Sequence, residues 1–201
     1  MTRRFLPLIL SGALVFVAVS PTLAQGLSGN AAERRAVLMV ERAERLDELF
    51  AELRRTSDPA EARLIEGRIW SEWMSSGSAT IDLMMGWASR AARTEDWGVA
   101  FDYLDQIIVL VPDYAEAWNR RATLHFVRGD YDKSIQDIEE TLKREPRHFG
   151  ALSGLGQIML RQERPDLARD AFERTLEVYP ANRSAQEALG RIEEELTGQS
   201  L

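Results

Sequence analysis

Two consecutive stretches of 34 residues decide the fold: AEAWNRRATLHFVRGDYDKSIQDIEETLKREPRH at 115–148 and FGALSGLGQIMLRQERPDLARDAFERTLEVYPAN at 149–182. Proline occupies the thirty-second position of both, and Pro112 precedes Pro146 by the same interval as Pro146 precedes Pro180. The same register therefore defines a third unit at 81–114. A repeat of this length is one supersecondary unit that cannot bury its apolar face alone, so we expect the three units to stack.

The positions that recur across the three units differ in the size of their side chains. Small residues stand at the eighth and twentieth positions: Ala88, Ala122, Gly156, Ala100, Ser134 and Ala168. Large residues at the twenty-fourth position are Leu104, Ile138 and Phe172. Small side chains let two helices approach closely, and proline ends a helix because it lacks the amide donor. Each unit is thus predicted to be a pair of packed helices, with Gly129 and Asp130 forming the turn in the middle unit.

This pattern resembles the tetratricopeptide-repeat family. The residues that carry the resemblance are Trp118, Ala122, Gly129, Tyr131, Ile135, Leu142 and Pro146 in the middle unit, and Leu155, Gly156, Ala168, Phe172 and Pro180 in the last. The first unit is more degenerate, and Arg121, Thr141 and Thr175 depart from the family pattern. The resemblance implies an all-α, helix-turn-helix solenoid of three repeats at 81–114, 115–148 and 149–182. Taken whole, the chain resembles exported tetratricopeptide-repeat proteins of Gram-negative bacteria.

Helices are also predicted on both sides of the repeats. Two capping boxes, at Asn30 to Glu33 and at Asp58 to Glu61, predict an N-terminal helical hairpin over 30–77. Its apolar faces are predicted from spacings of three and four: Val37, Val40, Leu46, Leu49, Phe50 and Leu53, then Ala62, Ile65, Ile69 and Trp73. A capping helix with a polar outer face is predicted over 183–197. Its apolar stripe consists of Ala185, Leu189, Ile192 and Leu196.

The N-terminus has the features of an export signal over residues 1–24. Arg3 and Arg4 precede an apolar run from Leu8 to Val19. Thr22-Leu23-Ala24 then places small residues three and one positions before a signal-peptide cleavage site. We expect cleavage between Ala24 and Gln25, and a periplasmic or secreted product without further membrane insertion. An uncleaved membrane anchor is the alternative, although a span needs roughly 20 apolar residues.

Composition argues against several classes of function. The chain has no cysteine, two histidines and a formal net charge of -7. These numbers leave little for metal sites, and they disfavour a nucleic-acid partner. His125 is interpreted as a core or rim residue and His148 as a surface residue in the turn after Pro146, and Gly154 and Gly156 lie inside a predicted helix rather than in a phosphate loop. We find no catalytic set, and we expect neither enzymatic activity nor a cofactor or metal.

The family resemblance implies where a partner would bind. Positions two, five, nine, twelve and thirteen of each unit line a concave groove in that family. Carried over, they are Asp82, Met85, Ser89, Ala92 and Arg93, then Glu116, Asn119, Thr123, Phe126 and Val127, then Gly150, Ser153, Gln157, Leu160 and Arg161. Asn119 and Phe126 are predicted to be central to binding. The alternative is that some of these positions are merely solvated or covered by the N-terminal hairpin.

An extended peptide or a partner helix suits a groove of this mixed character. The carboxylate clamp of repeat proteins that serve heat-shock chaperones is absent, because only one of the corresponding positions is basic. Those positions are Met85, Ser89, Arg120, Gly150 and Gly154. The function predicted is that of a non-enzymatic scaffold or adaptor in the bacterial envelope. The alternatives are a self-associating structural module and an accessory subunit of an envelope complex; the oligomeric state stays open.

Overall fold

The computed structural model describes residues 21–198, and every regular element in that range is an α-helix. The chain divides after Val37 into two units, 1–37 and 38–201, and the packing described below lies within the second. The arginine pair and apolar run of the expected export signal fall in residues 1–20, outside the described residues. Within the described range, no helix combines the length and apolar character that crossing a membrane requires.

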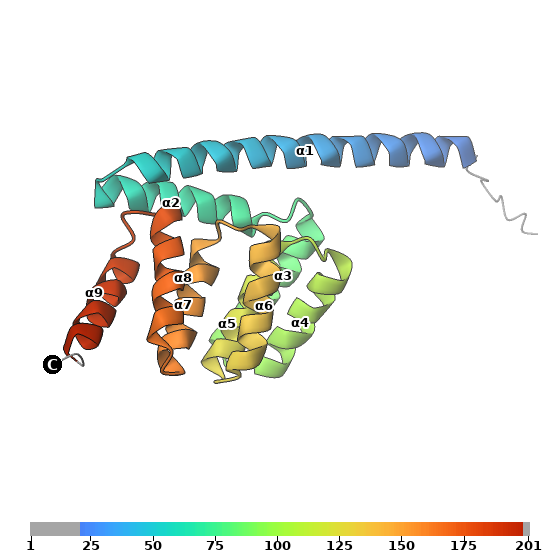
Figure 1. The fold of residues 1–201 in the computed structure, drawn as a ribbon. Helices are drawn as coiled ribbons and strands as arrows, with labels where there is room; N and C mark the ends of the chain where they lie inside the picture. Colours follow the sequence, from blue (N-terminus) through green and yellow to red (C-terminus); the bar gives the residue numbers. More distant parts are fainter. Residues whose placement is uncertain (1–20, 199–201) are drawn as a thin grey trace, which may run out of the picture. The chain divides into compact units, whose positions relative to one another are not determined.

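Six helices form the three predicted repeats (Figure 1). They are α3 (Ala79–Arg93) and α4 (Trp97–Leu110), α5 (Ala115–Val127) and α6 (Tyr131–Arg144), and α7 (Phe149–Arg161) and α8 (Pro165–Val178). Each second helix ends just before the repeated proline, with Val111, Glu145 and Tyr179 as its C-caps. The prediction of an all-α solenoid of three helix-turn-helix repeats is confirmed.

The turn inside each repeat has the same backbone conformation at its fifteenth position. Glu95, Gly129 and Glu163 have φ angles of 58°, 78° and 58°. In each turn the next amide donates to a carbonyl five residues back, closing the end of the first helix. These bonds join Asp96 to Ala91, Asp130 to His125 and Arg164 to Met159, each at 2.9 Å. Only the middle repeat has glycine at this position, so two glutamates adopt a conformation that L-residues disfavour.

The small positions lie where the two helices of a repeat touch. Gly156 shows the closest approach, because a Cβ built on it would come within 2.7 Å of Cζ of Phe172. The middle repeat has serine at the twentieth position, and the buried hydroxyl of Ser134 donates to the carbonyl of Ala122 at 2.8 Å. Small side chains at these positions therefore allow the close helix contact that the sequence predicts.

Each departure from the family pattern has a local explanation. The buried hydroxyls of Thr141 and Thr175 donate to the carbonyls of Asp137 and Ala171 in their own helices, at 2.8 and 2.9 Å. The guanidinium of Arg121 pairs with Asp137 at 2.7 and 2.8 Å, and its other end reaches Asp105 of the preceding repeat at 2.6 Å. Arg121 thus links two repeats through charge instead of apolar contact.

The N-terminal hairpin consists of α1 (Pro21–Arg55) and α2 (Pro59–Met74). The prediction that a helix starts at Asn30 is wrong, because the described residues are already helical from Pro21 onward. Val37 and Val40, predicted to be core, are instead 52% and 58% exposed. The other predicted apolar residues of the hairpin are buried.

The helix that follows the repeats is α9 (Arg183–Gly198). Ala185 and Ile192 of its predicted stripe are buried against α8, Leu189 is partly buried, and the side chain of Leu196 lies outside the described residues. Its opposite face exposes Glu187, Arg191, Glu193, Glu194 and Glu195. The described part of α9 therefore covers the apolar end of the last repeat and presents a charged surface.

Candidate interaction cleft and the network beside it

Helix α2 lies along the row of turns that connect one repeat to the next (Figure 1). The hydroxyl of Tyr114, in the first turn, donates to the carbonyl of Met74 at 2.9 Å. His148, in the second turn, is fully buried and not a surface residue as predicted, and its imidazole stacks on the indole of Trp73 with ring centroids 4.0 Å apart. The hydroxyl of Tyr179, at the end of the last repeat, donates to Glu66 at 3.2 Å.

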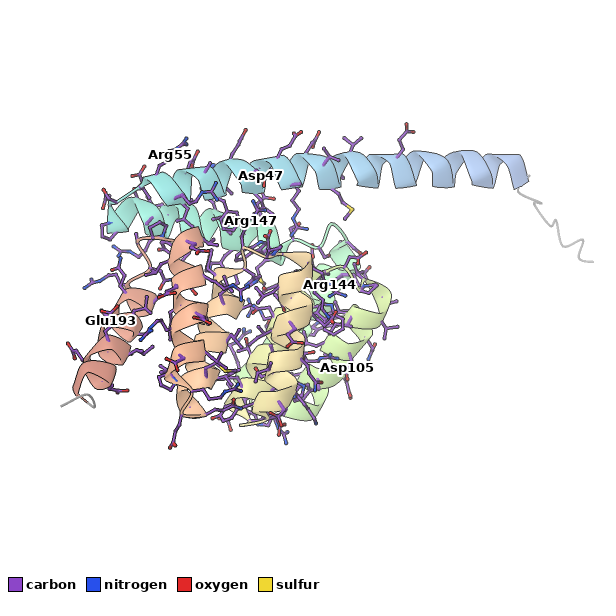
Figure 2. The ribbon with its side chains drawn as sticks, in the orientation of Figure 1. Asp47, Arg55, Asp105, Arg144, Arg147 and Glu193 are labelled. Atoms are coloured by element: carbon purple, nitrogen blue, oxygen red, sulfur yellow. The ribbon has the colours of Figure 1, made fainter. Side chains whose placement is uncertain are left out.

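The hairpin makes further contacts with the same edge of the repeats. Arg147 precedes α7 and pairs with Asp47 of α1 at 2.6 Å (Figure 2), while its guanidinium lies 4.4 Å from the ring centre of Phe50. Phe50 and Trp73 also contact Phe149, the first residue of α7. The hairpin and the repeats thus share one apolar core.

A buried carboxylate lies beneath α2. Glu116 is 1% exposed and accepts hydrogen bonds from Asn119 at 3.0 Å and from the Arg120 guanidinium at 2.6 Å. Nδ1 of His148 accepts from the amide of Ala151 at 3.1 Å, so Nε2 is the nitrogen that donates to Glu116, at 3.2 Å. Burial alone would raise the pKa of Glu116, but the bond from His148 and the charge of Arg120 hold that pKa below its ordinary value.

The hairpin removes part of the predicted groove from solvent. Glu116 and Asn119 are buried and bonded to each other, so they are not available to a peptide. Gly150 lies against Trp70, where an added Cβ would stand 3.0 Å from the indole. These three positions belong to the first turns of α5 and α7, which α2 covers. The interpretation of Asn119 as an exposed binding residue is therefore corrected.

The C-terminal turns of α3 and α5, the first helices of the first two repeats, are accessible to solvent. A cleft of about 270 Å³ lies between these two helices. Apolar side chains from three helices line it: Met85, Ala88, Ala92, Trp97, Leu104, Leu124 and Val127. Its polar lining residues are Ser89, Arg93, Arg120 and Thr123. Six of the groove positions carried over from the family thus meet in one cavity, whose lining is mostly apolar and includes two arginines.

The other predicted groove residues lie outside this cleft. Phe126 is partly buried against Tyr131, and the guanidinium of Arg161 lies 5.3 Å from its ring centre. Asp82 accepts from the amide and hydroxyl of Ser76 at 2.8 and 2.6 Å, which fixes the turn before α3. Ser153 and Leu160 are partly buried, and Gln157 is exposed.

A second hollow of about 390 Å³ surrounds His125 and was not predicted. It is lined by Phe101, Asp105, Arg121, His125, Arg128, Asp130 and Lys133. Burial lowers the pKa of His125, against the opposing charge of Asp137. In the described part of the chain, no three histidine, aspartate or glutamate residues are grouped so that they could hold a metal ion.

The docking of α2 along the turns was also missed. Its signal in the sequence is the aromatic character of the residues near each repeated proline: Tyr114, His148 and Tyr179. Tyr114 and His148 are the last residues of their units and Tyr179 lies three positions before the end of its unit, so all three lie at the end of a repeat, where they contact α2.

Comparisons with known proteins agree with this architecture. Two models described as tetratricopeptide repeat match residues 85–140 and 113–181. A TPR repeat-containing protein of Rhizobium etli is 51% identical over 155 residues, which cover 77% of this chain and 76% of that protein.

Solved structures share the fold at low sequence identity. The first TPR of Spaghetti (RPAP3) bound to the HSP90 peptide SRMEEVD superposes with a TM-score of 0.55 at 18% identity, covering 58% of this chain and 93% of that one. The Yersinia enterocolitica type III secretion chaperone SycD, in complex with a peptide of the translocator YopD, gives a TM-score of 0.55 at 13% identity, covering 59% and 95%.

Proposed function

Because the chain belongs to the tetratricopeptide-repeat family, we propose that it is a non-enzymatic interaction module that holds a segment of a protein partner in the cleft between α3 and α5. The open, largely apolar cleft carries this proposal. Specific binding sites combine an apolar lining with a few polar groups that fix orientation. Two structural relatives hold peptides, which supports the same use of this fold here.

The chemistry of the cleft defines the segment that fits it. Met85, Leu104 and Leu124 offer an apolar floor, while Arg93 is exposed at the side. A partner segment would place one or two apolar side chains in the cleft and an acidic side chain beside Arg93. An amphipathic helix or an extended strand can meet both conditions.

We propose that this binding takes place outside the cytoplasm, in the bacterial envelope. The support is the N-terminal sequence, with its arginine pair, apolar run and Thr22-Leu23-Ala24. Mass analysis of the protein from a cell fraction enriched in periplasm should find a chain that starts at Gln25. An intact Met1 in the membrane fraction would contradict this proposal.

A quantitative binding assay tests the cleft itself. The partner is first isolated by affinity capture with the wild-type protein. The affinity of this partner for the wild type and for each single variant is then measured by calorimetry. Val127→Glu puts a charge at the rim of the cleft, and Arg93→Glu reverses the charge there; we expect each to weaken binding at least about tenfold. The matched control is Val109→Glu, because Val109 is 79% exposed on α4 and does not line the cleft. If only the control variant loses affinity, the cleft is not the binding site.

A further inference from the structure

The first repeat leaves an apolar face uncovered. On α3, Leu83 and Trp87 are 53% and 41% exposed; on α4, Val99 and Leu110 are 40% and 61% exposed. The rings of Trp87 and Tyr103 lie 5.5 Å apart and join the two helices into one surface. We call this surface, formed by Leu83, Trp87, Val99, Tyr103 and Leu110, the stacking face.

The repeat register shows what such a face does elsewhere in the molecule. Leu83 and Trp87 occupy positions three and seven of their unit. The residue at position three is Ala117 in the second unit and Ala151 in the third. Each of these alanines is buried in a core that its repeat shares with the preceding one. Position seven of the middle unit is Arg121, which reaches back to Asp105 of the preceding repeat. The stacking face is therefore the side on which a repeat receives the one before it.

The size of the stacking face suits an interface between proteins. Its exposed apolar area is on the order of a few hundred Å², a size that is typical of interaction sites on soluble proteins. Together with a polar rim, two such faces would form a dimer interface near the lower end of the usual range, at roughly 1,200 Å² in total.

We propose that the stacking face binds the same face of a second copy of this chain, related by a two-fold axis. The stacking face of one copy is not expected to bind the C-terminal end of a second copy, because α9 covers that end and exposes Glu187, Arg191 and Glu194 there. An apolar face is complementary to itself, and two-fold dimers are the commonest symmetric assemblies.

The charges beside the stacking face support this arrangement. Arg90 lies on α3 seven residues after Leu83, and Asp102 lies on α4 three residues after Val99, so each flanks the apolar residues of its helix. Both are exposed, and neither forms an ion pair within the described residues. If the two-fold axis runs parallel to the helices, α3 of one copy faces α4 of the second copy, so Arg90 of one copy would lie near Asp102 of the other, and the contact would occur twice.

Sedimentation velocity of the purified protein tests this proposal at concentrations up to about 0.5 mM. We expect a reversible dimer, and we expect Leu110→Glu to raise its Kd at least about tenfold, because a charge would be buried in the interface. The control is Leu64→Glu, since Leu64 is 73% exposed on α2, a helix that contributes no residue to the stacking face. Circular dichroism during heating checks that each variant stays folded.

Charge reversal tests the two-fold geometry in particular. Arg90→Asp and Asp102→Arg should each weaken the dimer, whereas the double variant should restore it, because the opposite charges face one another again. A protein that is monomeric at every concentration overturns the proposal. So does a dimer that Leu110→Glu and Leu64→Glu affect equally, or a double variant weaker than both single ones. None of these outcomes depends on the peptide cleft, so this inference and the proposed function fail separately.

Discussion

The imidazole of His148 lies flat against the indole of Trp73, with ring planes only 8° apart. His148 is the last residue of the second repeat and the N-cap of α7, the first helix of the third repeat, and Trp73 belongs to the last turn of α2. The same imidazole bonds to Glu116 of the second repeat. One stacked pair therefore connects the hairpin with two repeats, and we expect these parts to unfold together.

Removal of the Trp73 side chain should separate the hairpin from the repeats. Trp73 is 3% exposed, so Trp73→Ala is expected to lower the free energy of unfolding by about 3–5 kcal/mol. Amide hydrogen exchange in α2 should become faster in the variant. Trp73→Phe should cost less, because Nε1 of Trp73 has no hydrogen-bond partner among the described residues. Leu64→Ala, at an exposed position of α2, is the control, and equal effects of the two alanine variants would contradict the assigned role.

The repeat register was predictable from the sequence because it rests on local spacing. Apolar residues spaced three and four apart form one face of each helix. Together with the small residues at fixed positions, these faces determine how the two helices of one repeat meet. The buried face of α2 was predictable for the same reason: Ala62, Ile65, Ile69 and Trp73 are all buried.

The docking of the hairpin was not predictable, because it depends on contacts between distant parts of the chain. The bond from Tyr179 to Glu66 joins residues 113 positions apart, and α2 lies outside the 34-residue register. Asn119 is buried and bonded to Glu116, and Glu116 is bonded to His148, which stacks on Trp73 of α2, so the pattern of a single repeat does not reveal that this groove position is closed.

The two glutamates with positive φ should limit stability. Glu163 has φ 58° in the turn where the middle repeat has Gly129 at 78°. A left-handed conformation costs an L-residue roughly 1–2 kcal/mol, and the greater freedom of unfolded glycine offsets part of the gain. Glu163→Gly should therefore raise the free energy of unfolding by about 0.5–1 kcal/mol, measured from urea midpoints. Gly129→Ala should lower it by a similar amount, and a lower midpoint for Glu163→Gly would disprove the explanation.

Substitution by alanine at two glycines of α7 should have opposite effects on the free energy of unfolding. At Gly156 a Cβ would come within 2.9 Å of three ring atoms of Phe172, so Gly156→Ala should destabilise by roughly 1–3 kcal/mol. At Gly154 a Cβ would stand 3.8 Å from Cδ1 of Ile138, an ordinary contact. Gly154→Ala should stabilise the helix by about 0.5–1 kcal/mol, because alanine loses less backbone entropy. Chemical denaturation of both variants measures the difference, and a tolerated Gly156→Ala would show that the helices can separate at no cost.

His125 should make stability depend on pH just below neutrality. Burial lowers its pKa in the folded protein from the ordinary value of 6.5, and Lys133 and Arg121 act in the same direction, while Asp137 and Asp130 partly oppose them. The unfolded chain therefore binds this proton at a higher pH than the folded chain does.

The sign of that dependence follows from linkage. The contribution of His125 is fully present above pH 6.5 and is lost as the pH falls from 6.5 through the lower folded pKa. Urea midpoints of the wild type should consequently decline between about pH 7 and pH 5. His125→Phe keeps an aromatic ring against Phe101, which lies 4.6 Å from the imidazole, and removes the titrating group. The decline should then be shallower, and a variant that keeps the wild-type slope would assign the pH dependence to other groups.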